Sequence, residues 1–393
     1  MRNEKITPLK GISDIIRLFG AGLALLLLLV LFPVSGFAQR QSDRPWWYTL
    51  EEGKFLFRSG AYGDALITFE DARRERLAQF TRMEEDFIRL LSRPDVRRLG
   101  DSLEFVEMYI AVNLESTAAS ALDSLFHYLP RNSFDGSAAR ALEGFSLLKN
   151  YPEAEYWLGE TYRMEGELSL ALLQYERALN NKNLFEVPGF DSEILYKMTE
   201  IHRLRQEYQE MERRAKEVIE GVGPSGEPRD VYWARNQTRS SMSRLLENEG
   251  INTFLTLYRH RSIETERAHR FLGLYYFSSS RYNPSAEHLM FSFLIQNTVI
   301  IEEIIRRQFD FTFSTLENLE AQARLMPELT AFQEQTEYYR TAYYLASALY
   351  ASGKTRPARE IWNFLARSVY AGEWGERARR NPNPYIERAV ELP

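Results

Sequence analysis

Residues 158–178, LGETYRMEGELSLALLQYERA, decide the fold of this chain of 393 residues. Five positions carry the pattern, and they lie seven, five, four and three residues apart: Gly159, Gly166, Ala171, Tyr175 and Ala178. The same spacing joins two further sets: Gly53, Gly60, Ala65, Phe69 and Ala72, and Ala346, Gly353, Ala358, Trp362 and Leu365. Recurrence of one helix–turn–helix unit indicates an array of stacked helical pairs.

Each position of the spacing has a physical sense. Gly159 and Ala171 are small, as two helices require where they cross closely. Gly166 falls at the turn, where a residue that adopts positive φ is useful. Tyr162 and Tyr175 are large enough to fill the wedge between the helices. The stretch therefore predicts two antiparallel helices joined by a tight turn.

With Leu158 before the first glycine and Tyr162 after it, this block resembles the tetratricopeptide repeat, whose pattern is W-x₂-L-G-x₂-Y, then A-x₃-F and a later proline. Two features depart from that pattern, because Glu155 replaces the tryptophan and Pro188 arrives late. The resemblance implies an all-α fold, a right-handed superhelix (solenoid) of antiparallel helix pairs. Three weaker copies of the same spacing begin at Val106, Thr199 and Gly273.

The units begin near residues 46, 99, 152, 192, 266 and 339, which leaves room for further helical pairs at 229–260 and 300–335. Strand alternation is absent, and we assign Phe309 and Phe313 to a helical stripe that continues from Ile301. We expect a linker at 39–44, an N-terminal array at 45–222 and a C-terminal array at 229–372. The Gly/Pro-rich residues 223–228 are the expected hinge loop, and residues 373–393 are expected to be a tail that frays or lies along the surface.

Residues 1–38 have the order of a secretory signal peptide. Arg2, Lys5, Lys10 and Arg17 precede fifteen uncharged residues, and cleavage is expected after Ala38. The apolar run is shorter than the roughly 20 residues of a spanning helix, but an uncleaved anchor stays an alternative. We therefore expect an exported, periplasmic protein, or one anchored in the inner membrane and facing the periplasm.

The leader holds four basic and two acidic residues, so the rest carries 45 Lys and Arg against 53 Asp and Glu, a net charge of −8. This balance argues against nucleic acid as a partner, and a membrane is expected only through the N-terminal segment if that segment is uncleaved. The chain has no cysteine, which suits an oxidising compartment without a disulfide framework.

No motif predicts chemistry. The glycines at 221, 223 and 226 fit a dinucleotide fingerprint only as text, because a charged helix precedes them and Pro224 interrupts them. The five histidines form no zinc pattern, and no serine lies in a nucleophile elbow. We expect no catalytic residue, metal or cofactor. A glycosidase-like pair of distant carboxylates stays open.

In the resembled family, the first helix of each unit lines a concave groove that binds proteins or peptides. Transferred position by position, the groove residues are Glu153, Tyr156, Glu160, Arg163, Glu193, Tyr196, Glu200, Arg203, Arg267, Arg270, Arg340, Tyr343 and Tyr350. A solvated face with internal ion pairs, Glu160 with Arg163 and Glu200 with Arg203, is the alternative. The expected function is a non-enzymatic adaptor of the bacterial envelope that binds a protein or peptide. The alternatives are an accessory protein that holds a small ligand in the lumen, and an envelope enzyme.

Overall fold

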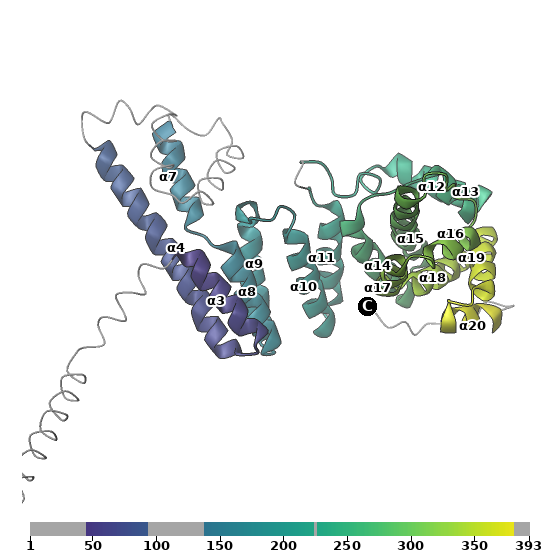
Figure 1. Cartoon of the computed structure of the whole chain (residues 1–393), viewed down its shortest axis with the longest axis horizontal. Helices are drawn as coiled ribbons and strands as arrows, with labels where there is room; N and C mark the ends of the chain where they lie inside the picture. Colours follow the sequence, from purple (N-terminus) through teal and green to yellow (C-terminus); the bar gives the residue numbers. More distant parts are fainter. Residues whose placement is uncertain (1–44, 93–136, 224–225, 381–393) are drawn as a thin grey trace, which may run out of the picture. The chain divides into compact units, whose positions relative to one another are not determined.

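The computed structural model describes residues 45–92, 137–223 and 226–380 (Figure 1). The chain divides into two compact units, residues 1–165 (unit 1) and 166–393 (unit 2). In the described residues every regular element is a helix, and the extended pairing there is an isolated bridge between Val222 and Pro228. The predicted all-α class is confirmed for this part of the chain.

Unit 1 contains α3 (Trp46–Arg58), α4 (Tyr62–Leu91), α7 (Ser137–Leu148) and α8 (Pro152–Met164). The long helix α4 contacts each of the other three. Its Arg76 is buried, donates from Nε to the Leu148 carbonyl at 2.9 Å, and lies 4.5 Å from the ring centroids of Trp46 and Tyr151. The guanidinium thus joins α3, α4 and the α7–α8 connection, with cation–π contacts in place of water.

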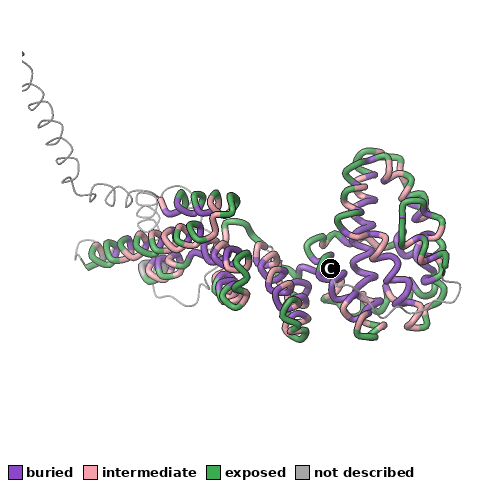
Figure 2. The backbone as a smooth tube through the Cα atoms, turned by 90° about the horizontal axis from the view of Figure 1, so that it is seen from below, coloured by how far each residue is buried: buried purple, intermediate pink, exposed green. Residues whose placement is uncertain are grey.

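In unit 2, most contacts are between helices that are close to one another in the sequence. Its helices are α9 (Leu168–Asn180), α10 (Asp191–Leu204), α11 (Tyr208–Glu220), α12 (Asn236–Glu249), α13 (Ile251–Leu257), α14 (Ile263–Ser278), α15 (Tyr282–Arg307), α16 (Leu316–Ala323), α17 (Pro327–Gln335), α18 (Tyr338–Ala351), α19 (Thr355–Arg367) and α20 (Gly372–Arg380), with a 3₁₀ turn at Lys182–Leu184. In the hairpins α10–α11 and α14–α15, the second helix also contacts the first helix of a later hairpin, α14 and α18 respectively. In the hairpin α18–α19, the second helix contacts the single helix α20. One cluster of buried apolar residues extends from Met242 of α12 to Ala378 of α20, and Figure 2 colours the backbone by burial.

The turns of the repeat share one backbone conformation. The residue at the predicted turn position has a positive φ in all five copies that the structure describes: Gly60 (82°), Gly166 (84°), Gln206 (60°), Ser280 (58°) and Gly353 (84°). In four of these turns the next N–H donates to the carbonyl five residues earlier: Ala61 to Leu56, Glu207 to His202, Arg281 to Tyr276 and Lys354 to Leu349. This hydrogen bond is the mark of a Schellman motif, which ends a helix and reverses the chain.

The small residues of the pattern lie where helices meet. A Cβ built on Gly53 would lie 2.5 Å from the Phe69 ring, and one built on Gly273 would lie 2.5 Å from the Leu289 side chain. Ala65 and Ala72 are fully buried beside Phe69 on α4. The hairpins therefore close to a distance that larger side chains would not permit.

Four details of the sequence-based organisation differ from the structure or lie outside it. The signal peptide, the linker at 39–44 and the copy that begins at Val106 fall outside the described residues. The unit boundary lies between residues 165 and 166, and not at 223–228. At the end of the 223–228 loop, Arg229 is paired with buried Asp191 of α10. Nothing in the described residues tests whether the loop is a hinge, so the hinge stays a prediction. Residues 372–380 form a helix that packs on α18 and α19, so of the two predicted behaviours of the tail fraying was wrong for them, and residues 381–393 lie outside the described residues.

The helical stripe predicted through Phe313 is also wrong. Helix α15 ends at Arg307, and Phe309 is 90% exposed. The next helix begins at Leu316, because the Thr315 hydroxyl caps it by accepting from the Asn318 N–H at 3.2 Å. The Leu316 N–H donates to Asn252 of α13 at 3.1 Å. The helical pairs predicted at 229–260 and 300–335 are confirmed as α12–α13 and α16–α17.

Helix α15 is, within the described residues, the one helix whose length and apolar composition would allow a membrane span. Most of that apolar window is buried within the protein, against α14 and α18. It also carries the buried polar residues His288, Gln296, Asn297 and Thr298. These contacts make α15 the central core helix of unit 2.

A buried polar cluster ties the α11–α12 connection to α14 and α15. The Asp230 Oδ2 atom lies 2.8 Å from His260 Nε2 and 3.0 Å from His269 Nε2, and its Oδ1 accepts from the Trp233 N–H at 2.7 Å. His269 Nδ1 lies 3.0 Å from His288 Nδ1. Burial alone would raise the pKa of Asp230, but the hydrogen bonds to His260 and His269 outweigh it and hold the pKa well below the ordinary value. Burial lowers the pKa of His269, and lowers that of His288 further.

We predict that Gly53→Ala destabilises unit 1 by about 1–2 kcal/mol, because overpacking outweighs the gain in helix propensity. Gly63→Ala is the matched control: no atom lies within 4 Å of the added Cβ, so it should stabilise α4 by about 0.5–1 kcal/mol. Urea unfolding of both variants checks this. Equal effects would show that α3 and α4 do not meet at Gly53.

We predict that unit 2 loses stability as pH falls from 7 to 5. His269 and His288 have folded pKa values below the unfolded value of about 6.5, so the unfolded chain binds more protons below that pH. Each histidine then costs up to about 1.4 kcal/mol per pH unit. Asp230 contributes stability that is lost only at pH below about 4. Urea unfolding of wild type and His288→Gln should show a shallower pH dependence for the variant, and equal slopes would contradict the prediction.

Candidate functional site

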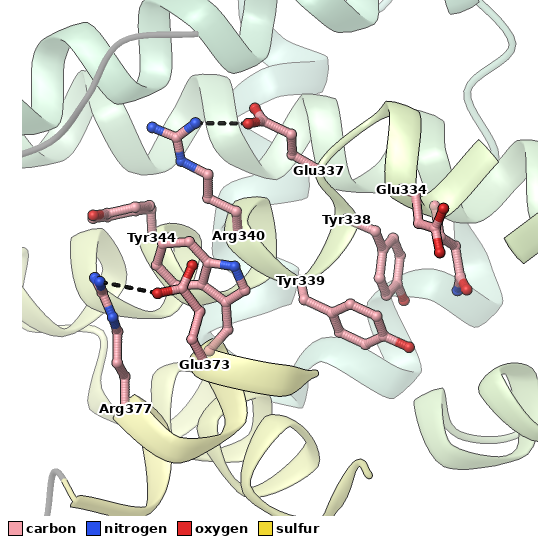
Figure 3. A pocket seen from close by; sticks show the side chains of 10 residues that line it. Glu334, Glu337, Tyr338, Tyr339, Arg340, Tyr344, Glu373 and Arg377 are labelled. Atoms are coloured by element: carbon pink, nitrogen blue, oxygen red, sulfur yellow. Dashed lines mark hydrogen bonds and ion pairs between the residues drawn. The ribbon is translucent and has the colours of Figure 1, made fainter. Parts of the chain in front are cut away.

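A cleft of about 820 Å³ opens in unit 2 between α17, α18 and α20 (Figure 3). It is lined by Gln333, Glu334, Glu337, Tyr338, Tyr339, Arg340, Tyr344, Glu373, Trp374 and Arg377. Pro327 at the first position of α17 and the left-handed residue before α18 fix where these helices begin. The cleft has the size of a site for a small molecule or a few peptide residues.

Glu337 determines how α18 enters the cleft. Its φ of 49° and ψ of 44° are left-handed, a conformation that costs a residue with a Cβ roughly 1–2 kcal/mol. Its carboxylate accepts from Arg340 at 2.7 Å and is also paired with Arg270 of α14. Arg270 in turn binds buried Glu266 at 3.2 Å. Charged hydrogen bonds to two arginines offset the backbone cost and join α14 to the start of α18.

The tyrosine hydroxyls of the cleft are engaged within the protein. Tyr338 donates to Asn297 of α15 at 2.9 Å, and Tyr339 donates to Glu320 at 2.6 Å while it accepts from Arg324 at 2.7 Å. Burial raises the pKa of both phenols, and the hydrogen bond to Glu320 raises that of Tyr339 further. Both residues therefore stay protonated, and their hydroxyls are committed to structure.

Aromatic rings cover the α20 side of the cleft. The Trp374 ring lies 5.7 Å from the Tyr344 ring and 5.5 Å from the Tyr343 ring. The Arg377 guanidinium lies 4.6 Å from the centroid of the same indole. Trp374 is half-buried, so this cluster offers apolar area at the surface.

Most charges in the cleft are paired within it. Arg340 binds Glu337 at 2.7 Å and Arg377 binds Glu373 at 3.2 Å, as Figure 3 shows. Glu334 is exposed, and no ion pair or hydrogen bond from the described residues reaches its carboxylate. The neighbouring Gln333 is only 2% exposed, and its Oε1 has no hydrogen-bond partner in that part of the chain.

The predicted groove residues of unit 1 lie on α8 but do not form an open face. Tyr156 and Glu160 are buried, with 8% and 6% of their surface exposed, and Glu153 and Arg163 are half-buried. Glu160 holds Arg163 by two hydrogen bonds of 3.1 and 2.8 Å. The ion pair of Glu160 with Arg163, which the sequence offered as part of the alternative, is therefore present, but burial of Tyr156 and Glu160 does not fit a solvated face.

In unit 2 the structure joins predicted residues of α10 and α14. Tyr196, 9% exposed, donates to the Glu264 carbonyl at 2.8 Å and accepts from the Ala268 N–H at 3.0 Å. Arg267 lies 4.9 Å over the Tyr196 ring and is paired with Glu200. The Glu200 pair is therefore made with Arg267, and not with Arg203 as the sequence suggested. Glu193 approaches Lys197 at 3.5 Å. Arg203 is half-buried, and its Nε has no hydrogen-bond partner among the described residues.

The remaining predicted residues divide between core and cleft. Arg340 lines the cleft, while Tyr343 is 2% exposed and packs on Trp374 behind it. Tyr350 lies 5.5 Å from the Trp362 ring of α19. Sequence reasoning missed the other residues of the cleft. The closely spaced tyrosines at 338, 339, 343 and 344 were the available signal. The repeat pattern selects residues three or four positions apart, so it included only Tyr343 among them.

Among the described residues, no group of three or more His, Asp and Glu side chains is placed to hold a metal ion. The Asp230 cluster is fully enclosed, with no exposure at Asp230 or His269. Its hydrogen bonds join the α11–α12 and α13–α14 connections to α14 and α15.

Comparison with known proteins identifies a relative but no family. An uncharacterized protein of Treponema pallidum (strain Nichols) is 23% identical over 372 residues, which cover 93% of this chain and 98% of that protein. No family model matches the chain. No solved structure matches it either.

We predict that Glu337→Gly is more stable than Glu337→Ala by about 1 kcal/mol, since only glycine adopts the left-handed backbone without cost. Both variants lose the bridge between Arg270 and Arg340, so their difference isolates the backbone. In an ordinary helix alanine would be favoured by about 1 kcal/mol. Thermal or urea unfolding measures the order, and an alanine variant equal to or above the glycine variant would contradict the left-handed assignment.

Proposed function

We propose that this protein is a non-enzymatic adaptor of the bacterial envelope, built from tetratricopeptide-like helical pairs, and that it holds a segment of a partner protein in the α17–α18–α20 cleft. The main support for this proposal is the cleft. An 820 Å³ opening lies against α18, the first helix of a repeat hairpin, and brings aromatic rings and paired charges to the surface. Tyrosine, tryptophan and arginine are the residues that most often anchor protein interfaces.

The repeat geometry supports the tetratricopeptide-like part of the proposal. Each of five turns has a residue with positive φ at the same position of the pattern. In unit 2, helices of neighbouring hairpins contact one another. Units that pack mainly on their sequence neighbours are typical of solenoids, which use their length as a binding surface. We extend this to a right-handed superhelix.

Peptide binding is favoured over catalysis by the state of the titratable groups in the cleft. Burial raises the pKa of Tyr338 and Tyr339, so these groups do not serve as bases near neutral pH. The two arginines are held by carboxylates, and the cleft contains no histidine. A small ligand held in the same opening is the second candidate, since the volume also suits one.

Export rests on the leader alone. A positive segment, an apolar run of fifteen residues and the small residues before Gln39 support a cleaved signal peptide and a periplasmic location. An inner-membrane anchor that leaves the helical units in the periplasm is the alternative.

We predict that a photo-crosslinking amino acid placed at Glu373, on the exposed rim of the cleft, captures a defined partner protein in cells. The same probe at Glu249, exposed beside a smaller hollow on α12, should capture none. The captured protein should then bind the purified full chain, and Trp374→Leu should weaken that binding at least tenfold through loss of the aromatic surface.

Trp47→Leu, at an exposed tryptophan of α3, is the matched control and should leave the affinity unchanged. Equal capture at both probe positions, or equal affinity of the two tryptophan variants, would contradict a partner site in the cleft. Mass spectrometry of this protein in the crosslinked complex should find Gln39 at its N-terminus. A retained leader would favour an inner-membrane anchor.

A further inference from the structure

We propose that the cleft recognises a basic side chain, lysine or arginine, on an extended segment of the partner protein, with Gln333 and Glu334 as its receptors. This inference rests on the proposed function, because it names the chemistry of the segment that the cleft holds. It follows from which polar groups of the cleft are satisfied within the protein and which are not.

Gln333 provides the first observation. Its side chain is 98% buried against the cleft, yet its Oε1 accepts no hydrogen bond from the described residues. A buried acceptor without a donor costs roughly 1–3 kcal/mol. The Oε1 of Gln296 also has no hydrogen-bond partner among the described residues, but Gln296 does not line the cleft. The Gln333 oxygen itself is enclosed, so rotation of the side-chain amide toward the cleft would be needed for an N–H donor from a ligand to satisfy it.

Glu334 provides the second observation, independent of the first. It follows Gln333 on α17, is exposed, and has no ion-pair partner among the described residues. The other two carboxylates of the cleft are different, since Glu337 binds Arg340 and Glu373 binds Arg377. The cleft thus carries three carboxylates and two guanidinium groups, and the unmatched charge is negative.

The hydrogen-bond donors of the cleft disfavour an anionic partner segment. Both arginines already have carboxylate partners, and the hydroxyls of Tyr338 and Tyr339 donate to Asn297 and Glu320. An anionic segment would compete with Glu337 and Glu373 for these guanidinium groups and would also approach Glu334. Like-charge juxtaposition of this kind disfavours a partner by several kcal/mol.

The aromatic wall suits the rest of a basic side chain. Lysine and arginine bury their methylene stems along apolar surface and keep the charged head on polar groups. Tyr344 and Trp374 supply such a surface, and Arg377 already lies 4.6 Å over the indole, which shows that this ring accepts a cation. A volume of 820 Å³ has room for the basic residue and its neighbours in a peptide.

The test uses pools of end-capped nonapeptides, randomised except at the central position, which is lysine, arginine, norleucine or glutamate. Retention on the immobilised full chain should be at least tenfold higher for the lysine and arginine pools than for norleucine, its neutral counterpart. Retention should fall as salt rises, since part of the recognition is between charges. Equal retention of the lysine and norleucine pools, preference for glutamate, or retention of none would overturn the inference.

Two variants assign the receptors. Glu334→Gln should lower retention of the lysine pool at least tenfold, whereas Glu249→Gln, an exposed and unpaired glutamate on α12, should not. Gln333→Met should lower it as well, and should leave the free protein as stable as wild type or more so, because it removes an unsatisfied acceptor. Loss of stability in Gln333→Met would show that the glutamine serves the fold, which overturns its role as a receptor.

A competition experiment distinguishes a basic side chain on a peptide from a free small amine. Spermidine at concentrations equal to the peptide pool should not displace it, because a free polyamine lacks the peptide that fills the rest of the cleft. Complete displacement would show a site for small amines and overturn the inference. If the probe at Glu373 captures a partner but the pools show no preference for basic residues, the proposed function stands and this inference fails.

Discussion

The close approach of paired helices is the constraint on which the rest of this structure depends. Gly53 and Gly273 lie so near the partner helix that an added Cβ would fall within 2.5 Å of its side chains. A left-handed residue reverses the chain after each first helix, at Gly60 and at Ser280. Because both features are local, each hairpin forms from its own residues, and burial is completed by the neighbouring hairpin.

Polar groups then join hairpins that hydrophobic packing alone would leave free to slide. Asp230 binds His260 and His269 across the α11–α12 connection and α14, and Glu266 accepts from Ser292 and Gln296 of α15 at 2.8 and 2.7 Å. Buried charges of this kind are costly unless every lone pair is satisfied. They fix one register between α14 and its neighbours, and through Arg270 and Glu337 they set where α18 begins.

Much of the fold follows from the sequence, but less of the candidate site. The helical pairs, the turn residues and the small contact residues were predicted, because each depends on residues within about twenty positions. The length of α15 was not, since its end at Arg307 depends on the capping of the next helix by Thr315 and on Asn252 from another helix. The helix α20 was missed because the Asn-Pro pairs that suggest a loose tail begin only at Asn381.

The sequence by itself determined an all-α chain of repeated hairpins, since spacing, turn conformation and side-chain size are properties of short segments. Tertiary structure decided which polar side chains face the cleft. Tyr156, Tyr196 and Tyr343 occupy positions that a regular repeat would expose, yet neighbouring elements bury them. Conversely, α17 and α20 place Gln333, whose Oε1 is unsatisfied, and half-buried Trp374 in one cleft, although these residues are 41 positions apart in the sequence. Exposure and unmet hydrogen bonds depend on what packs alongside, and no local pattern encodes that.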